Sequence, residues 1–277
     1  MNRTENFNIY SDFPWVNIRI VLVETSHPGN IGAVARAMKN MQLESLYLVS
    51  PQRPPDSHSA ARSSGATDVL NNAVICNTLS EAISDCRLVI AASARLRSIP
   101  WPTEDPGKAT QKLVENALQA PVAMVFGRED RGLNNEELDH CHFMTRLPTN
   151  PDFSSLNIAA AVQVFCYEIQ KYYLEMKEQY LAGTLAKTEK LNSVADIDKP
   201  ASSENLINLF RHFEETLVQV HFMPEHRTRT LMRKLMRFYY KSQITEEEVS
   251  IFRGILTELQ RLSRINNEKN NNDAIEN

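Results

Sequence analysis

The sequence predicts an α/β protein built on a parallel sheet, followed by a smaller helical region. Short apolar runs such as residues 18–23 and 121–126 have the length and β-branched composition of strands buried on both faces. Helical patterns alternate with these runs in the first part of the chain, as they do in βαβ units. Beyond about residue 205 only helical patterns follow. A sheet domain is therefore expected first, and helices after it.

Each expected element rests on its apolar pattern and on the turn signals that bound it. The strands are expected at residues 18–23, 46–49, 88–92 and 121–126, with a short apolar piece at 74–76. The helices are expected at residues 31–41, 79–85, 106–119, 157–176, 206–220, 227–240 and 246–262. Residues 50–62, with three prolines, are expected to form a loop, and a short acidic helix and a second short strand are expected between 132 and 147. Asn30 is expected to cap the first helix, Asn157 the long apolar one, and Thr245 with Glu248 to form a capping box.

Composition divides the chain into segments. Residues 175–204 are polar and contain glycine and proline, which is typical of a linker, and the last residues are polar and asparagine-rich. We expect an N-terminal extension over 1–17, an α/β domain over 18–176, a linker over 177–204, a helical region over 205–265 and a disordered tail over 266–277.

Composition also limits the class of protein. A net charge of −4 means that a nucleic-acid partner would need a local concentration of basic residues. The four cysteines are widely spaced and form no CxxC pair, which argues against disulfides or zinc and favours a reducing cytosol. The N-terminus lacks the apolar core of a signal peptide, and no apolar run approaches the roughly 18–20 residues that span a bilayer. We expect a cytoplasmic protein without a membrane or metal partner.

Four polar loops follow the predicted strands, at residues 24–30, 93–97, 127–132 and 147–157. Ligands of parallel sheets bind beyond the carboxyl ends of the strands, so these loops are expected to form one site. Gly127, directly after a buried strand, would let a ligand approach the backbone. The loop is neither a P-loop nor a GxGxxG fingerprint, which argues against nucleotide hydrolysis and a standard dinucleotide fold.

Structural roles compete with functional ones at several positions. Arg36 fits a solvated or salt-bridged arginine, and it also fits a side chain that faces the site. Asn30 and the segment 154–157 are explained as well by helix capping. Residues 140–142, His-Cys-His, have no further ligand at metal-binding spacing, and no GxSxG elbow supports a hydrolase.

A basic strip lies late in the chain, between His226 and Lys241. It contains no acidic residue, and its cations are Arg227, Arg229, Arg233, Lys234, Arg237 and Lys241. Such a strip is either a solvated helix face or a footprint for phosphate contacts. Arg95 and Arg97, beside Trp101, favour the second interpretation.

Three separated segments together resemble the three motifs of the SpoU branch of the SPOUT RNA ribose 2′-O-methyltransferases. They are residues 30–38 (NIGAVARAM), residues 125–129 (VFGRE) with Gly132-Leu133, and Leu147-Pro148 with residues 154–157 (SSLN). Their order and spacing match across about residues 17–170. The stretches SARLRSIPWP and NPDFSSLNIAAAVQVFCYE, and the helical C-terminal region, resemble the TrmJ type, which methylates nucleotide 32 in the tRNA anticodon loop.

The resemblance implies a deep trefoil knot at the carboxyl side of the sheet, a homodimer, and S-adenosylmethionine held in the knot. The cofactor contacts implied by the motifs are Ala92, Ser93, Ala94, Gly127, Leu147, Ser154, Ser155 and Leu156. Arg36 and Ser155 are the implied catalytic residues, and the residues implied to hold the site together are Asn30, Glu129 and Asn157. Arg95 and Arg97 are implied to contact tRNA.

The resemblance leaves the substrate open between this nucleotide, another tRNA position and ribosomal RNA. A non-catalytic RNA-binding knot protein would be expected to lose Arg36, Ser155 or Gly127, and all three are present. The chain departs from the family pattern at Gln42, where the family usually has a glycine that ends the first helix in a left-handed turn. A side chain there is expected to cost about 1 kcal/mol.

Overall fold

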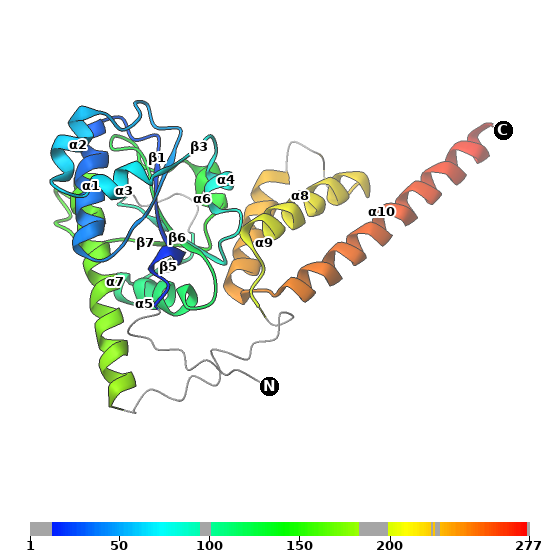
Figure 1. Ribbon diagram of the computed structural model, residues 1–277. Helices are drawn as coiled ribbons and strands as arrows, with labels where there is room; N and C mark the ends of the chain where they lie inside the picture. Colours follow the sequence, from blue (N-terminus) through cyan, green and yellow to red (C-terminus); the bar gives the residue numbers. More distant parts are fainter. Residues whose placement is uncertain (1–12, 95–100, 183–198, 223, 225–227, 276–277) are drawn as a thin grey trace. The chain divides into compact units, whose positions relative to one another are not determined.

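The computed structural model describes residues 13–94, 101–182, 199–222, 224 and 228–275 (Figure 1). The predicted contacts Arg95, Arg97 and Arg227 and most of the predicted linker and N-terminal extension lie outside these residues. The chain divides into two compact units, residues 1–193 and 194–277, and each is described by itself. The division falls within the predicted linker.

The first unit contains a seven-stranded sheet whose strand pairs are all parallel, in the order β3-β2-β1-β6-β4-β7-β5. The strands are β1 (Ile18–Val23), β2 (Ser45–Val49), β3 (Val74–Cys76), β4 (Leu88–Ala92), β5 (Thr103–Glu104), β6 (Val122–Phe126) and β7 (Phe143–Thr145). Every residue of β1 and β6 is buried, because helices cover both faces of the sheet. The predicted parallel α/β fold is confirmed, and the sequence did not reveal the two-residue strand β5.

The helices of this unit lie on both faces of the sheet (Figure 1). They are the 3₁₀ turn η1 (Trp15–Asn17), α1 (Pro28–Asn40), α2 (Ser57–Ser63), α3 (Thr67–Asn71), α4 (Leu79–Ile83), α5 (Pro106–Ala117), α6 (Asn135–Asp139) and α7 (Ile158–Leu181). Helix α7 packs against α1 and α5, and its Phe165 meets Phe126 of β6 with ring centroids 5.8 Å apart. The predicted cap by Asn157 is confirmed, because its side chain accepts a hydrogen bond from Ala159 N.

Two predictions about local structure are wrong. Residues 57–63 form α2 rather than a loop, because Asp56 caps the helix and Ser59 completes a capping box with a short hydroxyl in place of the usual Glu or Gln. Asn30 is not the cap of α1. The helix begins at Pro28, His27 Nδ1 accepts a hydrogen bond from Gly29 N, and Pro28 supplies the fixed φ of a first helical residue. The Asn30 side chain therefore remains available to the site.

The second unit consists of helices α8 (Ser203–Gln219), α9 (Thr228–Ser242) and α10 (Glu246–Ile275). Tyr239 packs among Phe210, Phe213 and Phe252, with ring centroids 5.2 to 5.9 Å apart. The predicted capping box is confirmed, since Thr245 N donates to Glu248 Oε2 at 2.7 Å. Helix α10 runs to Ile275 and so includes most of the segment 266–277 for which the sequence predicts disorder.

We expect Gln42→Gly to raise the free energy of unfolding by about 1 kcal/mol. Gln42 has φ +63°, a left-handed conformation in which glycine has no steric penalty. It follows the C-cap Met41 in a Schellman arrangement, in which Leu43 N donates to Met38 O and Gln42 N to Lys39 O. Chemical denaturation of the variant measures the gain.

Gln42→Ala is the matched control. It removes the same side chain but keeps the Cβ atom that causes the strain, so no gain is expected. An equal gain in both variants would contradict the explanation.

Candidate active site

A cavity of about 340 Å³ lies at the carboxyl ends of strands β4 and β6. Ala92 closes β4 there, Phe126 closes β6, and Ile158 begins α7. All of the implied cofactor contacts line this cavity: Ala92, Ser93, Ala94, Gly127, Leu147, Ser154, Ser155 and Leu156. The structure therefore brings together residues from three of the four predicted loops.

The loop between Gly127 and Gly132 turns back on itself beside the cavity. Gly132 N donates to Arg128 O at 2.8 Å, and Gly132 has φ +66°. The Cα of Gly127 lies so close to the far end of the loop that an added Cβ would be 2.2 Å from Leu133 N. Only glycine at position 127 allows the two ends of the loop to meet in this way.

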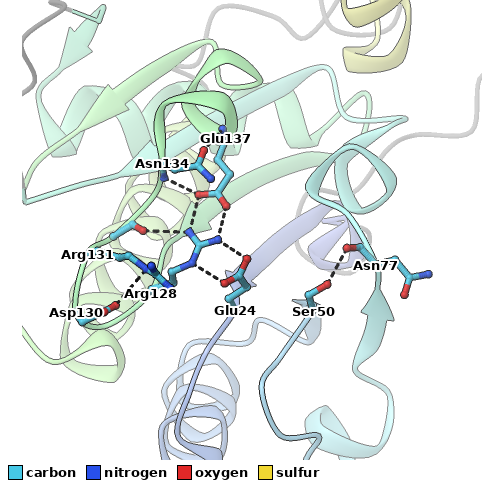
Figure 2. A network of polar contacts seen from close by, with 9 residues as sticks. Glu24, Ser50, Asn77, Arg128, Asp130, Arg131, Asn134 and Glu137 are labelled. Carbon is cyan, nitrogen blue, oxygen red and sulfur yellow. Dashed lines mark hydrogen bonds and ion pairs between the residues drawn. The ribbon is translucent and has the colours of Figure 1, made fainter.

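Arg128 fixes this loop to its surroundings (Figure 2). Its Nε donates to Glu24 Oε2 at 2.7 Å and its Nη2 contacts Glu24 Oε1, while its two Nη atoms donate to the Glu137 carboxylate at 2.9 and 3.0 Å. The Arg128 side chain is only 9% exposed. The hydrogen bonds from Arg128 lower the pKa of Glu24, against a smaller opposing effect of burial. The loop is thereby tied to the end of β1 and to α6.

Sequence reasoning gave Arg128 no role of its own. Two signals were present: the arginine directly follows Gly127, and Glu137 lies in a short acidic helix. The partner Glu24 is 104 residues away along the chain, and no sequence pattern joins the two. A second hollow, of about 480 Å³, lies next to this ion cluster and is lined by Glu24, Arg128, Arg131, Gly132, Leu133, Asn134 and Asn135.

Glu129, Asn30 and Asn157 form a hydrogen-bonded chain beside the cavity. Glu129 Oε1 accepts from Asn30 Nδ2 at 2.8 Å, and Asn30 Oδ1 accepts from Asn157 Nδ2 at 3.3 Å. Glu129 Oε2 also accepts from Ser26 Oγ at 3.0 Å and from Ser26 N at 3.2 Å. Burial acts to raise the pKa of Glu129, but hydrogen bonds from Asn30, from its own backbone N–H and from Ser26 together outweigh it and hold the pKa below its ordinary value. The predicted loop at residues 24–30 therefore contacts the site through the hydrogen bonds that Ser26 and Asn30 donate to Glu129.

The two implied catalytic residues differ in position. Ser155 lines the cavity, and its side chain is exposed. Arg36 is exposed on α1 but does not line the cavity, and its Nη1 donates to Ser64 Oγ at 3.3 Å. Ser64 is the C-terminal cap of α2. In this structure the Arg36 side chain therefore lies over α2 rather than against Ser155.

The predicted basic strip is partly exposed on α9. Arg229, Lys234 and Lys241 are exposed and Arg237 is half-buried. Arg233 is only 8% exposed, so its inclusion in an exposed strip was wrong, because it lies on the side of α9 that packs into the unit. Trp101 is also buried, and its Nε1 donates to Cys141 O at 3.0 Å, so it anchors the chain and offers no surface to RNA.

His142 is a structural residue. It is 5% exposed, and its Nδ1 accepts a hydrogen bond from Val89 N at 3.1 Å. Burial lowers the pKa of His142 to about 4, so the ring is neutral near pH 7. Within the described ranges, no three His, Cys, Asp or Glu side chains are placed to hold a metal ion, and no helix has the length and apolarity needed to cross a bilayer.

Comparison with known proteins identifies the class. Residues 17–167 match the model of the SpoU rRNA Methylase family, and residues 204–270 match the model of the tRNA methyltransferase TrmJ, C-terminal domain. A TrmJ from Pseudomonas aeruginosa (strain UCBPP-PA14), named tRNA (cytidine/uridine/adenosine-2′-O-)-methyltransferase, is 45% identical over 249 residues, which cover 89% of this chain and 95% of the relative. The tRNA (cytidine/uridine-2′-O-)-methyltransferase TrmJ of Salmonella choleraesuis is 43% identical, covering 90% and 98%.

Solved structures agree with these matches. The crystal structure of TrmJ from Z. mobilis ZM4 has a TM-score of 0.71 and 31% identity, covering 87% of this chain and 98% of that one. A probable methylase family protein from Haemophilus influenzae has a TM-score of 0.56 and 38% identity, covering 90% and 98%. The chain belongs to the SpoU methylase family of methyltransferases and, within it, to the TrmJ group. The resemblance stated from the sequence motifs is confirmed.

Proposed function

We propose that this chain methylates a ribose 2′-hydroxyl in the tRNA anticodon loop, at nucleotide 32, on cytidine, uridine or both. The observation that carries the proposal is the gathering of the motif residues around one cavity, next to the Asn30–Glu129–Asn157 chain. The names of the relatives from P. aeruginosa and S. choleraesuis support tRNA as the substrate and the ribose 2′-oxygen as the acceptor. The choice of nucleotide 32 as the target is supported by the motif resemblance alone.

The cavity suits S-adenosylmethionine as the methyl donor. Its volume of about 340 Å³ lies in the range of about 300–1,000 Å³ that is usual for small-molecule sites. It offers apolar surface from Phe126, Leu147 and Phe165, and hydroxyl groups from Ser154 and Ser155. When bound, the cofactor supplies a methyl group on a sulfonium sulfur, which is the electrophile of the reaction.

The protein's own part is to place the ribose and to manage its proton. Ser155, at the mouth of the cavity, is assigned to contact the ribose. Arg36 is a poor base, because a guanidinium stays protonated in proteins. We assign Arg36 to orient the target phosphate and to stabilise the developing alkoxide, with the proton passing to phosphate, Ser155 or water. Its exposure on α1 leaves it accessible to an RNA that approaches from solvent.

Arg36→Ala is expected to lower kcat by about a hundredfold to a thousandfold, the usual cost of removing one charge-stabilising donor. Arg36→Lys keeps the positive charge and is expected to stay within about tenfold of the wild type. Stability should change little in both, because the side chain is exposed and its hydrogen bond to Ser64 is long, at 3.3 Å. Single-turnover methyl transfer at saturating tRNA measures the effect. Wild-type turnover in Arg36→Ala would contradict the assignment.

The direct test of the proposed function is methyl transfer from labelled S-adenosylmethionine to total tRNA, followed by mapping of the modified nucleotide. We expect label at a 2′-oxygen of nucleotide 32. Label only in ribosomal RNA would overturn the proposal in favour of a different substrate. No label in either RNA, with intact cofactor binding, would favour a non-catalytic RNA-binding protein.

We also propose a homodimer that acts in the cytoplasm. Supporting the dimer, α7 presents an apolar face to solvent: Val164, Tyr167 and Leu174 recur at helical spacing and are 39%, 52% and 44% exposed. A tRNA substrate favours the cytoplasm.

The RNA contacts proposed on α9 are Arg229, Lys234, Arg237 and Lys241, and the proposals for Arg95, Arg97 and Arg227 rest on the sequence alone. The trefoil knot likewise remains a prediction.

A further inference from the structure

The exposed face of α9 carries a phenylalanine between lysines. Phe238 is 65% exposed. Lys234 lies one turn before it and Lys241 one turn after it, so the three share one side of the helix, and both lysines are exposed. In the part of the chain that the structure describes, no carboxylate forms an ion pair with either lysine. The ring therefore stands in an uncompensated positive field.

The Phe238 ring rests on a rigid support. It meets Tyr239 edge-to-face, with ring centroids 5.5 Å apart and an interplanar angle of 82°. Tyr239 is 6% exposed and is held by Phe210, Phe213 and Phe252. The aromatic core of the unit is thus complete without Phe238, and exposing this ring brings the fold no packing gain.

We infer that Phe238 is a stacking platform for an unpaired nucleobase, with Lys234 and Lys241 contacting the phosphates on either side. Single-stranded nucleic acid is bound by such pairs of features, an aromatic face for the base and cations along the backbone. A duplex hides its base faces and has no use for an exposed ring, whereas an RNA loop presents bases that can splay out. This inference rests on the proposed function, which supplies an anticodon loop as the substrate.

Phe238→Ala in the full chain is expected to weaken binding of an anticodon stem–loop RNA by about tenfold to a hundredfold, the usual effect of losing one stacked base. Phe238→Trp should bind at least as tightly as the wild type. Binding of the blunt duplex made from the same stem should change less than about twofold in either variant, because duplex binding uses cations that contact the phosphates and does not use the ring. Phe222→Ala is the matched control, since Phe222 is 67% exposed and lies beyond the end of α8.

A second readout reports stacking itself. The stem–loop is made with 2-aminopurine at each unpaired position in turn, and stacking on an aromatic ring quenches its fluorescence. We expect one position to be quenched by the wild type and by Phe238→Trp but not by Phe238→Ala. Wild-type loop affinity in Phe238→Ala would overturn the inference, as would an equal loss for loop and duplex. Loss of binding to anionic vesicles with RNA binding unchanged would assign the ring to a membrane surface instead.

These outcomes separate the inference from the function beneath it. If the wild type methylates tRNA but Phe238→Ala binds the stem–loop normally, the inference alone fails. If no RNA is methylated but stem–loop affinity still depends on the ring, the proposed function alone fails. Binding of S-adenosylmethionine should be equal in all variants, because Phe238 lines no part of the cofactor cavity.

Discussion

Gly127→Ala should weaken S-adenosylmethionine binding and slow methyl transfer. An added Cβ would lie 2.2 Å from both Gly132 C and Leu133 N, well inside van der Waals contact, and both of these are backbone atoms that cannot rotate away. The loop must open to admit the methyl group, and this loop forms a wall of the cavity. Overpacking of this kind costs roughly 1–3 kcal/mol. Cofactor affinity measured by calorimetry should fall by roughly fivefold to 150-fold, since each 1.4 kcal/mol is a factor of ten.

Gly254→Ala is the control for this variant. Gly254 lies inside helix α10, and an added Cβ would meet nothing within 4 Å. The same substitution should therefore leave cofactor binding unchanged and raise stability by about 0.5–1 kcal/mol, since alanine is the better helix former. Normal cofactor affinity in Gly127→Ala would show that the loop does not form the cofactor wall.

Arg128→Met should destabilise the protein by about 3 kcal/mol. The guanidinium is 9% exposed and makes paired contacts with two carboxylates, of which Glu137 is 12% and Glu24 is 37% exposed. Its removal leaves two like charges close together, one of them nearly buried and without its counter-ion, and breaking such a cluster usually costs several kcal/mol. Urea denaturation measures the loss. Arg131→Met should cost less than about 1 kcal/mol, because Arg131 is 63% exposed and its Asp130 contact is 3.8 Å long.

The pH dependence gives an independent check of the Arg128 cluster. Arg128 holds the pKa of Glu24 below its ordinary value of 4.5. A carboxylate with a depressed pKa contributes stability above its unfolded pKa and loses it as the pH falls through the folded pKa. The wild type should therefore lose stability below about pH 4.5, and Arg128→Met should lose less over the same interval. Parallel pH profiles in the two proteins would show that Arg128 does not set the titration of Glu24.

The sequence predicted the sheet well, because β1 and β6 are buried along their whole length, β4 is buried up to its last residue, and all three are apolar apart from Arg19. It missed α2, where a serine stands in for the usual Glu or Gln of a capping box. It misplaced the start of α1 by treating Asn30 as a cap, because a histidine at position 27 is an uncommon capping residue. Local patterns decide such boundaries only when the usual residues are used.

The candidate site divides in the same way. Strand-end position brought the loops together in the prediction, and the motif resemblance selected the residues that now line one cavity. The ion cluster of Arg128 was not predicted, because its partners Glu24 and Glu137 lie in separate segments. The burial of Arg233 was not predicted, because a run of charges does not reveal which side of a helix packs inward. Both depend on tertiary contacts, which leave no periodic mark in the sequence.

The series of hydrogen bonds from Glu129 through Asn30 to Asn157 has a consequence for how the enzyme folds. Its links join residues 99 and 127 positions apart, so no short fragment of the polypeptide contains the set. Closing such long loops carries an entropic cost that is recovered only when the distant contacts form. A growing polypeptide cannot form these hydrogen bonds before Asn157 has been synthesised and α7, which follows it, has packed against the sheet. The proposed site is therefore complete only when the whole α/β domain has folded.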